Sequence, residues 1–430
     1  MARSGAQRVG STVAVVLAGG GARGAYEIGA LSALLPRLEE RGERPRVIVG
    51  TSVGAINAAY LAATAADPLE QALEKGFRLW SEIGFDDVLK PLLSPSELAR
   101  ALGSVGEFLG VPGAHVWSLL DPSPLARTLK ARIPLARIHA NVAGGALDAA
   151  AVVATAAHSG GSVVFHDGGG RVRDDRDRAI QYVPARLRLE HVRASAAIPG
   201  VFPAVRVGAP RAAAGWYFDG GTRLNTPIKP ALALGAERVV VIALNSLRSA
   251  ATRGRPEALD GASQLAQAVL VDPLVHDVQT LATINTIVGA RARASATGAG
   301  ATRARAAARG SRGAPASSGA AVRGRRDSRH RRVPYILVAP ERPDEIGAIA
   351  ARVYREHYAG LIEGVSSPNV ALLGRAFNAG HSPARGELFS YLFFAREFAQ
   401  ALMRRGREDA QRWLRRRHDD GPWRVREPPR

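Results

Sequence analysis

The chain has 430 residues, no cysteine and a formal net charge of +20. The absence of cysteine excludes disulfides, thiolate metal sites and a cysteine nucleophile. No apolar run approaches the ~18 residues that a membrane-spanning helix needs, and the run at residues 13–18 is too short for a secretory signal. We therefore expect a cytoplasmic protein that is attached to a membrane at most peripherally.

The positive charge is concentrated in two segments. Residues 291–332 hold twelve arginines against one aspartate, and residues 403–430 hold ten arginines against five acidic residues. The remainder of the chain is nearly balanced in charge. The basicity therefore belongs to these segments and says little about the fold.

The N-terminal elements predict a parallel βαβ unit. Residues 13–18 are a short, β-branched run that ends in glycines, which is typical of a buried strand. Apolar residues then recur every three or four positions over 24–40, as in an amphipathic helix. A second short strand is expected at 46–50 and a helix of small residues at 55–66. Since no hairpin signal separates the two strands, we expect them to be parallel.

The later elements extend this pattern. Residues 68–135 are mostly helical in pattern, with breaks at proline and glycine, and are expected to form a cap or wall over a pocket. Residues 150–207 are β-rich, and 239–244 is a further buried strand. The remaining expected elements are an amphipathic helix at 262–290, a strand at 333–338, and helices near 346–363, 369–379 and 386–417.

The segment 291–332 differs from the rest of the chain. It consists mainly of Ala, Arg, Gly and Ser, and it has neither aromatic residues nor a hydrophobic period. Such a segment buries too little apolar surface to offset the entropy of ordering, so we expect a disordered insertion.

Two glycine-rich turns follow the first two strands. The turn Gly19–Gly24 matches G-x-G-x-x-G, but the second strand ends without the acidic residue that a dinucleotide-binding unit places there for the ribose. The second turn, Gly50-x-Ser52-x-Gly54, matches the nucleophile elbow, in which a strained strand-to-helix turn presents a serine hydroxyl. Several of the histidines that follow the serine are candidates for the third member of a Ser–His–Asp triad, and none of these has a suitable strand-end context; they are His166, His191, His276, His357 and His381.

Four sequence blocks together resemble the patatin-like phospholipase family over about residues 12–245. They are Gly19–Gly24, Gly50–Gly54, Ala194-Ser195 with Pro199, and Asp219-Gly220-Gly221. The resemblance implies a three-layer α/β/α sandwich with a central, mostly parallel sheet and additional C-terminal helices. It also implies a Ser–Asp dyad, without histidine, that acts on the acyl esters of lipids.

Two Asp-Gly-Gly triplets compete for the role of the base. Asp167 lies between two β-like runs, where Asp-Gly supplies the dihedral angles of a hairpin turn. Asp219 ends a strand and is followed by Asn225-x-Pro227, as in the family pattern. We therefore favour Asp219.

The resemblance implies a set of site residues without metal or cofactor. Asp219 accepts the proton of Ser52, which attacks the ester and forms an acyl-enzyme. Arg23 is expected to brace the glycine loop. The expected site comprises the catalytic residues Ser52 and Asp219, the oxyanion-hole residues Gly19, Gly20, Gly21, Ala22, Arg23 and Gly24, the elbow glycines Gly50 and Gly54, and the supporting Gly220 and Gly221.

The expected partners follow from this reading. The substrate is a phospholipid or another acyl-ester lipid, and the Arg-rich segment 291–332 is either a solvated linker or a contact with anionic membrane. Specific nucleic-acid binding is not expected, because aromatic residues for stacking are missing there. The alternative functions are a catalytically inert lipid-binding scaffold and a carboxylesterase for non-lipid substrates. The expected organisation is a tail at 1–11, an acyl hydrolase domain at 12–290, the insertion at 291–332, a last strand with C-terminal helices at 333–417 that packs on the domain, and a basic tail at 418–430.

Overall fold

The computed structural model describes residues 11–90, 120–248, 281, 283, 285, 286, 332–360, 368–376 and 383–426. The Arg-rich insertion, most of the helix expected at 262–290 and part of the wall expected at 68–135 lie outside these residues. The expected contact of the insertion with anionic membrane therefore stays a prediction, as do the domain boundaries.

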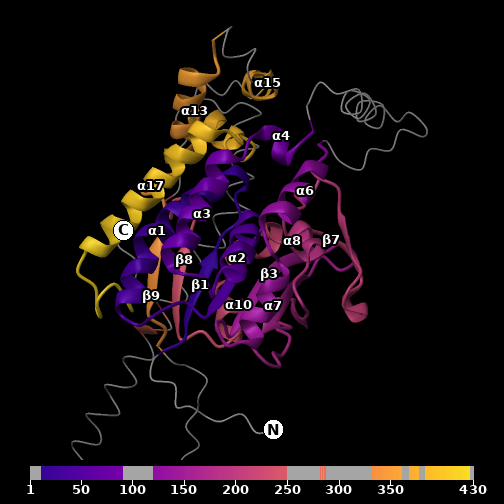
Figure 1. The fold of residues 1–430 in the computed structure, drawn as a ribbon, viewed down its shortest axis with the longest axis vertical. Coiled ribbons are helices and arrows are strands. Elements are labelled where there is room, and N and C mark those ends of the chain that lie inside the picture. The colour runs from indigo at the N-terminus through magenta and orange to yellow at the C-terminus, as the bar shows by residue number, and fades with distance from the viewer. Residues whose placement is uncertain are drawn as a thin grey trace, which may run out of the picture.

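A nine-stranded sheet runs through the centre of the described residues, and helices pack on it (Figure 1). Seven strands follow the order β5-β4-β3-β2-β1-β8-β9, while β7 pairs with β3 and β6. Five of the eight strand pairings are parallel. The strands are β1 (Val13–Leu17), β2 (Val47–Thr51), β3 (Ala149–Ala156), β4 (Ser162–Gly168), β5 (Ile180–Pro184), β6 (Val205–Val207), β7 (Gly215–Asp219), β8 (Arg238–Ile242) and β9 (Tyr335–Val338).

This arrangement confirms the predicted α/β fold with a mostly parallel central sheet. The strands β1, β2, β3 and β9 are buried at every position, as their continuous apolar sequences require. The helices are α1 (Ala25–Glu40), α2 (Val53–Ala63), α3 (Leu69–Glu82), α4 (Phe85–Val88), α6 (Ser123–Arg132), α7 (Ala136–Ala143), α8 (Leu189–Ser195), α9 (Gly221–Leu224), α10 (Ile228–Ala233), α13 (Glu345–His357), α15 (Pro368–Ala376), α16 (Pro383–Phe389) and α17 (Arg396–Arg415), with short 3₁₀ helices η1 (Gly21–Gly24) and η2 (Arg211–Ala213).

The C-terminal helix α17 packs closely along α1, although the two are far apart in sequence (Figure 1). A Cβ on Gly29 would lie 2.0 Å from the Met403 carbonyl oxygen, and one on Gly406 would lie 2.1 Å from that of Tyr26. Each helix therefore brings a glycine against the backbone of the other, and a side chain at either position would separate them.

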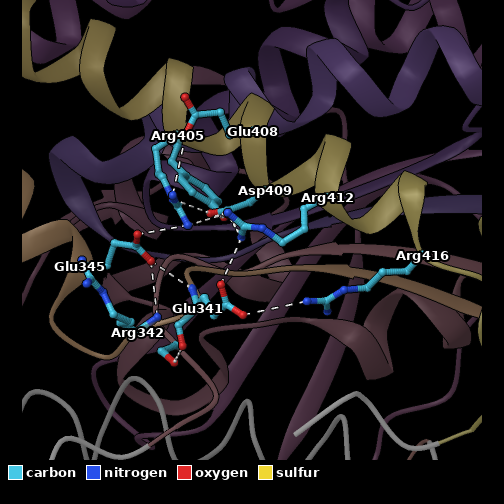
Figure 2. Close-up of polar contacts among 10 residues, drawn as sticks. Glu341, Arg342, Glu345, Arg405, Glu408, Asp409, Arg412 and Arg416 are labelled. Atoms are coloured by element: carbon cyan, nitrogen blue, oxygen red, sulfur yellow. Dashed lines mark hydrogen bonds and ion pairs between the residues drawn. The ribbon is translucent and has the colours of Figure 1, made fainter.

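A buried polar network fastens this contact (Figure 2). The Asp409 carboxylate of α17 accepts a hydrogen bond from the Tyr26 hydroxyl of α1 at 2.8 Å. It also pairs with Arg405 at 2.8 Å and Arg412 at 2.5 Å. Arg405 in turn reaches Glu345, the first residue of α13, at 3.0 Å. Because removing one partner of a buried ion pair leaves an uncompensated charge, the network holds α17, α13 and α1 together.

One sequence prediction about the helices was wrong. The single helix expected at 386–417 is two helices, α16 and α17, because residues 390–395 leave the helix to contact the glycine loop described below. The region 150–207 is β-rich as predicted, and it also contains the short helix α8. Separately, none of the described helices is both long and apolar enough to span a membrane.

Candidate active site

The register along β3 explains how the serine and the aspartate meet. Strand β2 runs parallel to β3 and ends with Thr51 opposite Val153. Strand β7 runs antiparallel to β3 and ends with Asp219 opposite Ala154. Since β4 pairs along the whole other edge of β3, β2 and β7 share one edge and their C-terminal ends meet there. The residue that follows Thr51 is the serine of the elbow.

Ser52 occupies a strained backbone position between β2 and α2. Its φ of 56° and ψ of −124° lie in a region that L-residues rarely adopt, at a cost of about 1–3 kcal/mol. The turn depends on the flanking glycines, because a Cβ on Gly50 would lie 2.0 Å from the Gly54 carbonyl oxygen. A Cβ on Gly54 would lie 2.4 Å from the Leu17 carbonyl oxygen. The elbow glycines are thus required by close packing of the turn against β1.

Ser52 and Asp219 form a buried pair. The Ser52 Oγ donates a hydrogen bond of 2.5 Å to Asp219 Oδ2, and the Gly221 N–H donates one of 2.6 Å to Asp219 Oδ1. Ser52 is only 5% exposed and Asp219 only 4%. Burial raises the pKa of Asp219 to about 7, although the hydrogen bonds from Ser52 and Gly221 lower it. The carboxyl group is therefore poised to gain or lose a proton near neutral pH.

A short segment after α8 positions both members of the pair. Ser195 Oγ accepts a hydrogen bond of 2.9 Å from the Ser52 N–H and donates one of 2.5 Å to the Val153 carbonyl oxygen. Two residues later, the Ala197 carbonyl oxygen accepts the Asp219 N–H at 2.8 Å. Ser195 belongs to one of the four sequence blocks that resemble the patatin-like family, but its role could not be predicted from the sequence. Its fully buried hydroxyl fixes the backbone of the elbow.

The glycine loop after β1 offers two unused donors. The N–H of Gly19 is bonded to Asn225, that of Ala22 to the Tyr391 carbonyl oxygen at 2.9 Å, and that of Arg23 to Gly20. Among the described residues, the N–H groups of Gly20 and Gly21 donate no hydrogen bond in the structure. Among the expected oxyanion-hole residues, Gly20 and Gly21 therefore have free N–H donors, whereas the N–H groups of Gly19, Ala22 and Arg23 hold the loop in place.

Arg23 braces the loop from inside the protein. Its fully buried guanidinium donates to Ser390 Oγ at 2.8 Å, to Asn245 Oδ1 at 2.7 Å and to the Glu387 carbonyl oxygen at 2.6 Å. It also pairs with the Glu387 carboxylate at 2.8 Å and lies 3.7 Å from the centre of the Tyr391 ring. All its nitrogens are engaged within the fold, so the geometry favours bracing over contact with a substrate phosphate.

The second Asp-Gly-Gly triplet lies elsewhere in the sheet. Asp167 and Gly168 both belong to β4, opposite Ala150 and Ala149, so the hairpin turn expected at Asp167 was wrong. The strand that pairs with β4 on its other side is β5, and that pairing is parallel. The Asp167 carboxylate contacts His139 Nδ1 at 3.1 Å. Asp167 is thus bound at the opposite end of β3 from the elbow.

The described histidines lie away from the Ser–Asp pair. His166 and His191 are buried and each contacts a backbone carbonyl oxygen, at 2.8 Å and 2.7 Å. Burial lowers the pKa of both imidazoles. His357 lies near the end of α13, and His276 and His381 are outside the described residues. Within the described part of the chain, no histidine is hydrogen-bonded to either member of the pair, and the dyad stays a prediction.

An apolar cavity of about 80 Å³ opens beside the serine. Its walls come from α2, α3, α4 and α6 and from the segment after α8, so the described parts of 68–135 form the wall that the sequence predicted. The lining includes Ser52, Gly21, Ile56, Trp80, Leu129 and Phe202. A cavity that is almost entirely apolar suits a hydrocarbon chain whose carbonyl end lies at the serine.

A buried polar chain links this cavity to the glycine loop. Asn57 donates to the Gly24 carbonyl oxygen at 2.9 Å and to Glu27 Oε2 at 2.7 Å. Trp80, whose ring lines the cavity, donates from Nε1 to Asn57 Oδ1 at 3.0 Å. Burial raises the pKa of Glu27 well above its usual range. Sequence reasoning missed these residues, because their pattern is that of ordinary amphipathic helices.

Comparison with known proteins gave a family. The model of patatin-like phospholipases matches residues 15–232, just over half of the chain, and this range includes both members of the Ser–Asp pair. Among solved structures, VipD from Legionella pneumophila is similar at 14% sequence identity and a TM-score of 0.28. That match covers 76% of this chain and 61% of VipD. No curated protein gave a significant sequence match.

Proposed function

The chain belongs to the patatin-like phospholipase family, and on this premise we propose that it is a serine hydrolase of phospholipase A or lysophospholipase type that cleaves the acyl esters of membrane lipids. The observation that carries the proposal is the 2.5 Å hydrogen bond between Ser52 and Asp219 at the mouth of the apolar cavity. A nucleophile bonded to a base with matched pKa is the arrangement that covalent ester hydrolysis needs.

Acylation begins with the hydrogen bond already present. Asp219 takes the Ser52 proton as the oxygen attacks the ester carbonyl, and a carboxyl group with a pKa of about 7 is ionised in half of the molecules at neutral pH. The negative charge that develops on the carbonyl oxygen is stabilised by the N–H groups of Gly20 and Gly21. Loss of one such donor typically costs ~3–4 kcal/mol of transition-state stabilisation. Asp219 then returns the proton to the departing alkoxide.

Deacylation reverses these roles with water. The acyl chain stays in the apolar cavity, attached to Ser52 through an ester bond. Asp219 takes a proton from a water molecule, which attacks the acyl carbonyl, and the same two N–H groups receive the oxyanion. Asp219 returns its proton to Ser52 as the fatty acid leaves. No group other than these residues is needed to balance the reaction.

The cavity supports an acyl-lipid substrate over a polar ester. Burying each methylene of a chain contributes about 0.8 kcal/mol, so an apolar cavity favours a hydrocarbon substituent over a polar one. The guanidinium of Arg23 is engaged within the fold, so it is not expected to select the head group.

The test uses purified full-length protein and Ser52→Ala as its control. A fluorophosphonate probe is expected to label the wild type and not the variant, because labelling requires an activated serine. Release of fatty acid from phospholipid and lysophospholipid in detergent micelles is then measured by mass spectrometry. Labelling without fatty-acid release, but with cleavage of water-soluble esters, would indicate a non-lipid carboxylesterase. The absence of labelling would indicate an inert scaffold.

A further inference from the structure

The β6–β7 hairpin carries an unusually exposed tryptophan. Trp216 is 56% exposed. Among the described residues, the only other large apolar side chain that is exposed is Leu372 on α15, at 39%. A tryptophan ring exposes far more apolar surface than most residues, and burying it elsewhere would be favourable. Trp216 therefore presents an amphipathic ring to the surroundings of the hairpin.

Three exposed arginines lie on the hairpin or on the elements next to it. Arg206 is the cross-strand partner of Trp216, and Arg211 lies in η2 at the far end of the hairpin. Arg223 lies over the turn after β3, since a Cβ on Gly160 would be 3.4 Å from its Nη2. This turn is tied to the hairpin, because the Ala157 N–H bonds the Trp216 carbonyl oxygen at 2.9 Å.

The charge of this surface is positive. None of the three arginines has an ion-pair partner within the described ranges. One acid, Glu190 of α8, accepts a hydrogen bond of 3.1 Å from the Gly208 N–H of the hairpin. The surface therefore carries three cations against one anion, next to an amphipathic ring.

The hairpin is also continuous with the active site at both ends. Phe202, which lines the apolar cavity, precedes β6 by three residues. Asp219 follows Trp216 by three residues along β7, which corresponds to roughly 10 Å of extended backbone. A ligand bound on this hairpin therefore lies close to the residues that process the ester.

We propose that the β6–β7 hairpin is the surface on which the protein docks to an anionic phospholipid bilayer. Trp216 lies at the level of the lipid head groups, where tryptophan rings concentrate at membrane–water interfaces. Arg206, Arg211 and Arg223 face the lipid phosphates. The substrate role of the bilayer rests on the proposed function, whereas the binding itself does not.

A bilayer fits this surface better than the other classes of partner. A single tryptophan offers no row of rings on which successive bases of a nucleic acid stack. The ring and its surrounding cations instead match a layer with apolar depth and anionic surface, and only a bilayer would also deliver an ester to the nearby serine. Each basic residue near an anionic membrane contributes ~1 kcal/mol, which is about a fivefold change in partition.

The experiment measures flotation of the full-length Ser52→Ala protein with phosphatidylcholine vesicles, with and without phosphatidylglycerol. The double variant R206Q/R211Q is expected to lower partition onto anionic vesicles about 25-fold, at ~5-fold per arginine. Trp216→Ala is expected to lower partition onto both kinds of vesicle. The matched controls are Leu372→Ala, which removes the other exposed apolar side chain, and Arg352→Gln on α13. Both controls are expected to bind as the parent does.

The outcomes separate this inference from the proposed function. Every variant contains the Arg-rich segment, so a difference in partition between variants comes from the substituted hairpin residues. Partition that is unchanged in both hairpin variants would overturn the docking surface. Dependence of duplex DNA binding, instead of vesicle binding, on the same residues would overturn it as well. The enzyme with Ser52 intact is assayed separately in detergent micelles. Hairpin-dependent vesicle binding together with no lipid hydrolysis would leave the docking surface in place and remove the proposed function.

Discussion

The chain contains the triplet Asp-Gly-Gly twice, and the two copies have different environments. Asp167 is the last residue but one of β4 and Asp219 is the last residue of β7, and both strands pair antiparallel with β3. Asp167 lies opposite Ala150 near the start of β3, whereas Asp219 lies opposite Ala154 near its end. Only the second position adjoins the elbow. The comparison teaches that the register on β3, rather than the triplet itself, decides which carboxylate meets the serine.

The two carboxylates also differ in their side-chain partners. Asp167 contacts an imidazole, that of His139, whose side chain is partly exposed to water. Asp219 has only a hydroxyl and a backbone N–H as partners, and neither carries a charge. Burial without an opposite charge is what raises the pKa of Asp219 to about 7. The environment that destabilises the anion is also the one that makes it a base.

The largest expected difference between the two triplets is in activity. Asp219→Asn removes the base while keeping its shape, and we expect kcat for ester hydrolysis to fall by ~10³-fold or more. Asp167→Asn is expected to leave most of the activity. Initial rates of fatty-acid release from micelles provide the measurement. Equal losses in the two variants would break the comparison, and a large loss only in a histidine variant would indicate a triad.

The next difference concerns stability and its dependence on pH. The pKa of Asp219 is about 7 in the folded protein, whereas the usual value for an aspartate side chain is 3.8. Between these two pH values the folded state therefore binds more protons than the unfolded state. Raising the pH from 4 to 8 therefore removes stability, by up to about 4 kcal/mol. Asp219→Asn eliminates this loss. We expect the variant to be more stable than the wild type at pH 8, with an advantage that shrinks toward pH 5.

Urea unfolding of both proteins at pH 8 and pH 5 measures this effect. The matched control is Asp167→Asn, which removes the buried carboxylate of the other Asp-Gly-Gly triplet together with its histidine contact. This variant is expected to lower the free energy of unfolding by about 1 kcal/mol. If Asp219→Asn were destabilising at pH 8, Asp219 would be stabilised as an anion in the folded state, contrary to its raised pKa.

The smallest expected effect is that of Ser195→Ala. Among the two triplets, only Asp219 is joined to the segment 195–197, through the Ala197 carbonyl oxygen. Removing the Ser195 hydroxyl leaves the Ser52 N–H without its acceptor, which costs about 1–3 kcal/mol and loosens the elbow. We expect kcat to fall about tenfold with little change in KM. Recovery of kcat in Ser195→Thr would support a positioning role, and a change confined to KM would argue against it.

Much of the fold could be predicted because local patterns and tertiary structure agree in its central part. The buried strands β1 and β2 are short apolar runs bounded by glycines, and the helix between them has a strong hydrophobic period. A crossover connection between two parallel strands is almost always right-handed, so its course could be predicted too. The elbow and the glycine loop were predicted for the same reason, since both turns adjoin these strands. The roles of Ser52 and Asp219 are not settled by their contact alone and stay predictions.

What could not be predicted depends on distant contacts. The break between α16 and α17 was missed because the apolar period continues through it, whereas Tyr391 turns toward the glycine loop. Ser195 and Asn57 act through buried side-chain hydrogen bonds, which leave no period in the sequence. The hairpin expected at Asp167 was wrong because the Asp-Gly pair, a strong turn signal, lies inside a strand that β3 holds in place.

The brace on Arg23 has a consequence for how the protein is made. Its partners Asn245, Glu387 and Ser390 follow it by 222, 364 and 367 residues. At synthesis rates of ~5–20 residues per second, the last of them leaves the ribosome roughly 20–70 s after the glycine loop. A nascent chain thus contains the serine and the aspartate well before the loop is fixed. The order of translation therefore delays the bracing of the glycine loop until Glu387 and Ser390 have been synthesised.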